Sequence, residues 1–227
     1  MQLKHIAFLT LSAVSTFAMA EGFDVVVVGS GGAGLSSAIT AKESGATVVV
    51  LEKMAYIGGN SNFASGGMNA AGTKQQLAAG VTQDSPELFY KDTMKGGHNL
   101  NNPALLKTLT ENAKYAEEWL VDLGAKFCFR KGRGGGQSIA RGHGPCDGSA
   151  VGPEILRVLT ERAAKDGIAI RTENQVVKIV MKNGAVAGVE VKTEDGVKTI
   201  DARAVVLATG GFGANQAMVT KYRPELK

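Results

Sequence analysis

The sequence predicts an α/β fold whose core is a parallel sheet, with an antiparallel meander inserted before the last parallel strand. Residues 25–28 are a continuous run of valines, which is typical of a strand buried on both faces. A glycine-rich turn, a helical segment and a second apolar run at residues 47–51 follow. The last third of the chain switches to short apolar runs separated by Asn183-Gly184 and Asp195-Gly196, which favour tight hairpins.

The first unit is predicted to run strand, turn, helix, strand. Leu35, Ala38 and Ile39 recur at helical spacing after the turn, and Gly45 stands where the glycine that ends a helix is expected. A helix that returns the chain to a neighbouring parallel strand is the first unit of a doubly wound sheet.

The middle of the chain is predicted to be helical. Ser85-Pro86 is typical of a cap followed by a first-turn proline, and Asn102-Pro103 repeats the pattern. A third helix is expected over residues 153–167. On the helix that begins at Pro103, one apolar stripe is predicted to face the core: Leu105, Leu106, Leu109, Ala113, Ala116, Leu120 and Leu123.

The last third is predicted to contain a strand, an antiparallel meander and a return to a buried strand at residues 204–208. The other expected strands are residues 168–172, 175–182, 185–192 and 197–201.

The composition is that of a globular protein and says little about its partners. Of the 227 residues 44% are hydrophobic, which is enough for one sizeable core. The formal net charge is +4 and the chain has no long basic run, so nucleic acid is not an expected partner.

The first 20 residues are predicted to be a cleavable signal peptide. Lys4 and His5 precede a largely apolar run at residues 6–14, and Ala18-Met19-Ala20 supplies the small residues that a signal peptidase accepts. The run is shorter than the roughly 20 residues of a membrane span. We therefore expect cleavage after Ala20 and an exported, periplasmic protein without a membrane span; an N-terminal strand or an uncleaved anchor is the alternative.

Cys128 and Cys146 are the two cysteines of the chain. Neither lies in a CxxC or CxxCH pattern, so a zinc knuckle, a thioredoxin-type site and covalently attached c-type haem lack their sequence signals. In an oxidising compartment the two cysteines could form one disulfide or remain as two free thiols, and the sequence favours neither alternative.

The turn after the first strand carries the pattern G-x-G-x-x-G at Gly29, Gly31 and Gly34. The first glycine permits a tight turn, the second lets a pyrophosphate approach the main chain, and the third lets the helix pack on the strand. Glu52 ends the second strand 18 residues after Gly34, where a carboxylate can accept hydrogen bonds from ribose hydroxyls. Lys53 could serve a phosphorylated ribose, but the acid favours an unphosphorylated one.

Residues 58–72, GGNSNFASGGMNAAG, indicate that the predicted dinucleotide site binds FAD rather than NAD. In a nicotinamide-binding domain the second strand usually leads into another helix. Here it leads into an uncharged, glycine-rich stretch whose main chain is open to a flat ligand. A meander inserted before LATGGFG, residues 207–213, is the layout of the two-dinucleotide-binding flavoproteins.

Four segments resemble the FAD-dependent fumarate reductase and succinate dehydrogenase flavoprotein family, in particular its soluble periplasmic branch. They are EKMAYIGGNSNFASGGMNAAGT, DSPELFYKDTMKGGHNLNNPALL, GGQSIARGHGPCDGSAVGPEIL and AVVLATGGFG. The resemblance implies a two-dinucleotide-binding, Rossmann-like FAD domain over residues 21–227. Relatives in that branch reduce fumarate, urocanate, methacrylate and other acrylates.

The resemblance also implies the residues that hold FAD. The ADP half would be held by Gly29, Gly31, Gly34, Glu52 and the adjacent Lys53. The isoalloxazine and ribityl chain would lie along Gly58, Gly59, Asn60, Ala64, Ser65, Gly66 and Gly67. Val176 would meet the adenine through its backbone, and Ala208, Thr209 and Gly210 would lie near the pyrophosphate.

Asn60 stands where membrane-bound relatives have the histidine that carries FAD covalently, so the resemblance implies dissociable FAD. Arg141 and His143 match the Arg-x-His of the family's loop near the flavin, whereas Gly144 replaces a second arginine. His143 is a general acid candidate by chemistry, and a hydrogen bond that orders the loop is the favoured alternative.

In the family, the arginine that protonates the substrate, and the residues that hold its carboxylates, follow a capping domain. They come after the segment that residues 21–227 match, so the resemblance implies an FAD domain without its C-terminal half, and no catalytic residue is expected here. Electrons would come from a separate c-type cytochrome. A truncated FAD-binding module without activity, and a related dehydrogenase or oxidase acting in the opposite direction, are the alternatives.

Overall fold

The computed structural model describes residues 21–226. The predicted signal peptide, residues 1–20, lies outside the described residues. None of the helices in the described part is both long and apolar enough to cross a bilayer.

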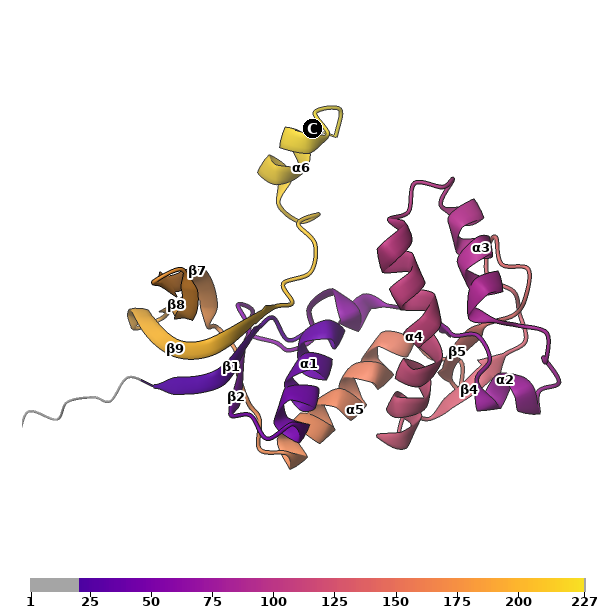
Figure 1. The fold of residues 1–227 in the computed structure, drawn as a ribbon, viewed down its shortest axis with the longest axis horizontal. Helices are drawn as coiled ribbons and strands as arrows, with labels where there is room; N and C mark the ends of the chain where they lie inside the picture. The colour runs from indigo at the N-terminus through magenta and orange to yellow at the C-terminus, as the bar shows by residue number, and fades with distance from the viewer. Residues whose placement is uncertain (1–20, 227) are drawn as a thin grey trace, which may run out of the picture.

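A six-stranded mixed sheet forms one end of the molecule (Figure 1), in the order β6, β2, β1, β9, β8, β7. β1, β2, β6 and the second half of β9 are parallel, and β7 and β8 are antiparallel, so the predicted parallel sheet with an inserted meander is confirmed. The strands are β1 (Gly22–Val28), β2 (Val48–Leu51), β6 (Ala169–Arg171), β7 (Gln175–Lys182), β8 (Ala185–Thr193) and β9 (Gly196–Leu207).

The two faces of this sheet are covered differently. Helices α1 (Gly32–Glu43) and α5 (Val151–Lys165) pack on one face, around Val27, Val50 and Leu159. On the other face Val26 and Val49 pack against Val189 and Ile200, because the sheet bends at β9 and the meander folds back over it. Within residues 21–226 the meander therefore takes the place of the second helical layer of a doubly wound sheet (Figure 1).

β9 departs from the prediction in two ways. The strands expected at residues 197–201 and 204–208 are one continuous strand, whose first half pairs with β8 and whose second half pairs with β1. The second half was expected to be buried, yet Leu207 is 62% exposed. The second half of β9 pairs only with β1, because the pairing between β8 and β9 ends at Asp201.

The other helices begin close to their sequence signals. Ser85 caps α3 (Pro86–Gly96) and Asn102 caps α4 (Pro103–Asp122), both through side-chain oxygens that accept main-chain N–H groups. α5 begins at Val151, two residues before the expected Pro153. Short helices α2 (Lys74–Ala78), α6 (Gln216–Tyr222) and the 3-10 helix η1 (Gly59–Phe63) complete the set.

The buried face of α4 is rotated from the predicted stripe. Leu106 and Leu120 are buried, but Leu105 and Leu109 are 71% and 54% exposed. Packing against α3 and α5 selects a face that includes the polar Glu117, whose Oε1 accepts a hydrogen bond from Gln75 in α2. A hydrophobicity pattern could not find this face because two of its members, Thr110 and Glu117, are polar.

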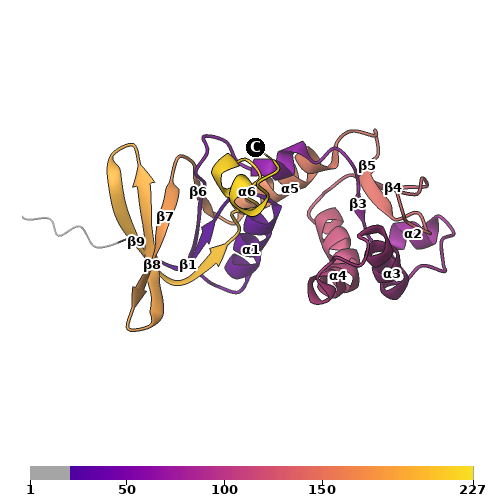
Figure 2. The same cartoon turned by 90° about the horizontal axis from the view of Figure 1, so that it is seen from above.

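A second lobe lies at the opposite end of the molecule from the large sheet, beyond α1 and α5 (Figure 2). It is built from α2, α3, α4 and a three-stranded sheet in the order β3, β5, β4. Its strands are β3 (Met68–Asn69), β4 (Phe127–Arg130) and β5 (Gly142–Pro145). Cys128 and Cys146 form a disulfide with an S–S distance of 2.03 Å. The disulfide decides between the two alternatives left by the sequence and joins β4 to the residue that follows β5.

The burial of Glu117 makes a prediction about stability and pH. Burial raises the pKa of its carboxyl to about 7, Glu118 adds to the shift, and Lys74 opposes it. A folded pKa above the ordinary value means that the native state holds the extra proton, so stability falls as pH rises from 4.5 to about 7. We expect Glu117→Gln to be more stable than wild type at pH 8, by about 1–2 kcal/mol, and no different below pH ~4.5.

Urea denaturation across this pH range measures the effect. Glu111→Gln is the matched control, because Glu111 lies on the same helix, is exposed and pairs only with Lys107 in the part of the chain described. A gain for Glu117→Gln that does not change with pH would contradict the argument.

Candidate functional site

The turn between β1 and α1 is fixed by contacts between main chains. Gly29 has φ +103°, and a Cβ there would lie 2.5 Å from the carbonyl oxygen of Ala208. A Cβ at Gly34 would lie 1.9 Å from the carbonyl oxygen of Gly29. Both glycines are therefore required by the protein's own packing, where the end of β9 crosses the start of α1.

Gly31 differs from its two neighbours in the motif. It caps α1 in an extended conformation, and the nearest atom to a Cβ there would be Ser61 Oγ at 3.4 Å. The protein's own packing leaves room for a small side chain at this position. Its glycine is explained if a ligand approaches the main chain, at the end of a helix whose free N–H groups attract anions.

Ser61 contacts this helix end, and it was not among the residues predicted from the sequence. The N–H of Gly32 donates to Ser61 Oγ at 3.0 Å. The hydroxyl oxygen lies where an oxygen of a bound phosphate would accept the same hydrogen bond. Its only sequence signal is a hydroxyl residue next to Asn60.

Glu52 ends β2 with its carboxylate held in place. The N–H and Oγ–H of Ser30 donate to Oε2 at 3.0 and 2.7 Å, and the N–H of Met54 donates to Oε1 at 2.9 Å. Burial acts to raise the pKa of Glu52, but these hydrogen bonds outweigh it and keep the pKa below its usual value. The carboxylate stays ionised and can accept a further hydrogen bond; Lys53 beside it is exposed.

Ser30 joins this carboxylate to the glycine-rich loop. Its Oγ donates to Glu52 and accepts from the N–H of Gly58 at 3.0 Å, and the residue is fully buried. Ser30 is one of the three variable positions inside the glycine motif, so the motif itself offers no reason to single it out.

The loop at residues 58–67 is packed on one side and open on the other. Gly58 has φ +105°, and a Cβ there would lie 2.4 Å from Leu156 of α5. Gly152 of α5 donates its N–H to the carbonyl of Ala64 at 2.9 Å and has no room for a Cβ beside Ser61. The outer positions are exposed: Asn60, Phe63, Ala64, Ser65, Gly66 and Gly67.

The remaining predicted residues lie next to these. The N–H of Ala208 donates to the carbonyl of Val28 at 2.9 Å, and Thr209 and Gly210 are exposed after it. Val176 lies in β7, two residues after Asn174, whose N–H donates to the carbonyl of Glu52 at 2.9 Å. The structure thus brings the predicted segments together at the carboxyl ends of β1, β2 and β9, which is where open α/β sheets bind ligands.

Arg141 and His143 are structural in their contacts. Arg141 is 1% exposed and forms ion pairs with Asp84 and Asp92 at 2.7 and 2.6 Å. His143 is fully buried, with Nε2 2.8 Å from Thr73 Oγ1, and burial lowers the pKa of its ring. These contacts favour the role of ordering the loop over that of a general acid.

Gly144 leaves space that Arg130 fills from the neighbouring strand. A Cβ at Gly144 would lie 2.6 Å from Nη2 of Arg130, which donates to the carbonyl of Ser149 at 3.1 Å. A positive charge is therefore present over position 144, supplied by another strand.

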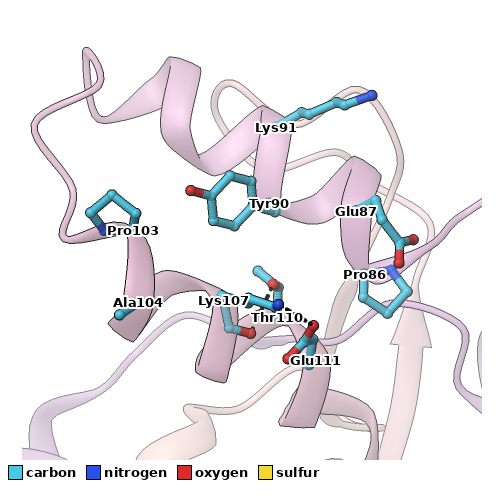
Figure 3. Close-up of a pocket in the computed structure, with 9 residues that line it drawn as sticks. All are labelled: Pro86, Glu87, Tyr90, Lys91, Pro103, Ala104, Lys107, Thr110 and Glu111. Carbon is cyan, nitrogen blue, oxygen red and sulfur yellow. Dashed lines mark hydrogen bonds and ion pairs between the residues drawn. The ribbon is translucent and has the colours of Figure 1, made fainter.

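A groove of about 570 Å³ lies between α3 and α4 (Figure 3). Tyr90 of α3 faces Lys107 and Glu111 of α4 across it, whereas the side chain of Lys91 extends away from α4. The groove lies in the second lobe and shares no residue with the glycine motif or the loop at residues 58–67. No group of three or more His, Cys, Asp or Glu side chains in residues 21–226 could hold a metal ion.

Comparison with known proteins gives the family. A family model described as an FAD binding domain matches residues 24–227. An NADH:fumarate oxidoreductase of Klebsiella pneumoniae (strain 342) is 50% identical over 207 residues, which are 91% of this chain and 22% of the relative. A fumarate reductase (cytochrome) of Shewanella frigidimarina is 47% identical over 206 residues, or 90% of this chain and 36% of the relative.

The fold agrees. The open conformation of a flavocytochrome c3 fumarate reductase superposes with a TM-score of 0.87 at 42% identity, covering 91% of this chain and 37% of that one. The chain thus spans between about a fifth and two fifths of these relatives. It belongs to the FAD-binding domain family, and these relatives are named as fumarate reductases or as an NADH:fumarate oxidoreductase.

Proposed function

We propose that this chain is the FAD-binding part of a periplasmic oxidoreductase that reduces the C=C bond of fumarate or a related unsaturated carboxylate. The observation that carries the proposal is the meeting of the glycine turn, Glu52 and the open loop at residues 58–67 at one edge of the sheet. The 1–20 segment would be removed on export, leaving residues 21–227 as the FAD domain.

The chain's own residues fit FAD. Glu52 would accept from the adenosine ribose, with Lys53 at the rim and the main chain of Val176 beside the adenine. Gly31 and the first N–H groups of α1, with Ser61, would bind the pyrophosphate, and Ala208, Thr209 and Gly210 would lie along it. Gly29 and Gly34 would act indirectly, because their contacts shape the turn.

The loop would hold the flavin itself. The exposed side of Asn60, Ala64, Ser65, Gly66 and Gly67 has little side-chain bulk to hinder a flat ring. When bound, the flavin supplies hydride to one carbon of the alkene. These residues would orient the ring and keep water from one of its faces, while the proton donor and the carboxylate-binding groups would belong to the rest of the whole protein.

The proposed reaction also needs an electron donor that reduces the flavin. A separate c-type cytochrome is proposed as the donor. The Shewanella frigidimarina relative is named "fumarate reductase (cytochrome)", which supports a cytochrome as the class of donor.

FAD binding can be tested at two glycines of the motif that differ in the space around them. Gly31→Ala has room within the protein, so it should fold with near-normal stability but bind FAD at least about tenfold more weakly. Gly34→Ala would put a Cβ 1.9 Å from a main-chain oxygen and should lose the fold as well. Fluorescence titration with FAD and thermal melts of the ligand-free chains measure the two effects.

Gly96→Ala, at the end of α3 with open space around it in the described residues, is the matched control and should change neither quantity. Tight binding by Gly31→Ala would contradict the proposed pyrophosphate site.

The asparagine at position 60 indicates that FAD is held without a covalent bond. An amide cannot form the bond that a histidine makes at this position in membrane-bound relatives. Acid precipitation of the flavin-loaded chain should therefore release all the yellow colour into the supernatant. Flavin that remains with the precipitated protein would contradict the prediction.

The whole protein's reaction can be tested with a reduced dye as electron donor and fumarate, urocanate or methacrylate as acceptor. We expect the longer protein to oxidise the dye with at least one of the three, and residues 21–227 alone to bind FAD without turnover. Oxidation of succinate or a steroid by an oxidised dye, with no reduction of any alkene, would instead favour the reverse-acting dehydrogenase.

A further inference from the structure

A set of buried polar side chains lies directly behind the loop proposed to hold the flavin. Its members come from the start of α2, the segment before α3, α3 itself, the segment leading into β5 and β5 itself: Thr73, Gln76, Asp84, Asp92, Gln137, Arg141 and His143. Asp92 and Gln137, at its edge, are partly buried. We call these seven residues the buried polar network. The general role of FAD binding does not explain why so many polar groups are buried here.

Most of the network's groups have partners. Gln76 Nε2 donates to Asp84 and to the carbonyl of Ala140, each at 2.7 Å, and Arg141 donates to Asp84, Asp92 and Gln137. The exception is Nδ1 of His143, which is buried and makes no hydrogen bond of normal geometry in residues 21–226, although the main chains of Arg141 and Met68 lie near the ring. A buried group left unpaired is costly, so its retention needs a reason.

The ring nitrogens of His143 can be assigned from Thr73. Thr73 Oγ1 accepts from the N–H of Gln76 at 3.0 Å, so its own proton is available to Nε2 of His143 at 2.8 Å. The opposite assignment would leave both the Thr73 proton and Nδ1 unpaired. Burial lowers the pKa of the ring, with main-chain groups of Arg141 and Met68 opposing it, so His143 is neutral with its proton on Nδ1.

The backbone of His143 touches the loop without any side chain between them. His143 pairs with Met68 across β3 and β5, and the N–H of Ala70 donates to the carbonyl of Arg141 at 3.0 Å. A Cβ at Gly67 would lie 2.9 Å from the carbonyl oxygen of His143. A shift of His143 is therefore passed directly to the main chain at residues 66–68.

The geometry points to His143 as a positioning residue for the flavin. Its hydrogen bond to Thr73 fixes the main chain at residues 66–68, on which the isoalloxazine ring rests, and so sets the flavin's affinity and redox balance. This inference rests on the proposed function, because it assumes that FAD lies along the loop.

The test compares two pairs of variants in the full chain loaded with FAD. His143→Leu removes the bond to Thr73, and His143→Gln keeps a polar group near Nε2. Thr73→Val removes the same bond from the other side, and Thr73→Ser keeps it. Because Thr73 also caps α2, Asn102→Ala is the matched control for the loss of a cap, on α4 and outside the network.

Three quantities are measured: the melting temperature without FAD, the Kd for oxidised FAD, and the flavin midpoint potential with its visible spectrum. His143→Leu and Thr73→Val should weaken FAD binding about tenfold or more and shift the potential and the absorption bands. His143→Gln and Thr73→Ser should recover most of both, and Asn102→Ala should lower only the melting temperature.

A merely structural role gives a different result. If His143→Leu and Thr73→Val melt earlier but keep the wild-type Kd, potential and spectrum, the inference is overturned. It is also overturned if His143→Gln and Thr73→Ser are as impaired as the disruptive variants. If His143→Leu does not fold, the two Thr73 variants decide. Failure of the wild-type chain to bind FAD would overturn the proposed function itself, and is seen before any variant is compared.

Discussion

The site depends on a place where main chains meet with no side chain between them. The end of β9 reaches Gly29 so closely that a Cβ there would lie 2.5 Å from the Ala208 carbonyl, and Gly34 packs on Gly29 still more tightly. This contact sets the distance between β9 and the start of α1. This close contact allows three groups to face the same candidate site: the free end of α1, the carboxylate of Glu52 and the chain after β9.

From this point the site is extended by hydrogen bonds rather than by apolar packing. Ser30 joins Glu52 to Gly58, and Ser61 joins the loop to the end of α1. Gly152 then seats the loop on α5. Polar links hold specific directions and distances, which a loop without a hydrophobic side of its own cannot obtain from burial.

Local features of the fold were predictable because their signals lie in neighbouring residues. The caps at Ser85 and Asn102 are confirmed, as is the hairpin at Asn183-Gly184, whose φ values are +53° and +80°. The buried face of α4 and the single strand β9 were not predicted, because neighbours far along the chain decide them. The same holds for Ser61, Gly152 and Arg130, whose roles appear only when separate elements come together.

The candidate site was predictable in a different sense. The pattern at Gly29, Gly31 and Gly34 gave the turn, and the resemblance gave most of the loop, but neither gave a reason for each residue. The structure supplies that reason for two of the three glycines, which its own packing requires. Gly31 has no such requirement, and this makes it the one whose identity argues for a ligand.

The division of the chain into two lobes has a consequence for the proposed cofactor. Its adenosine end would rest on the large sheet, through Glu52, and its flavin end on a loop held by the small sheet, through Gly67 and His143. A ligand that binds only the folded state stabilises whatever it contacts. FAD would therefore add a second link between two lobes whose apolar cores already meet, where Leu120 and Phe127 pack into the cluster around α1 and α5. The second lobe's buried ion pairs would then serve to hold one half of a site whose other half lies on the sheet.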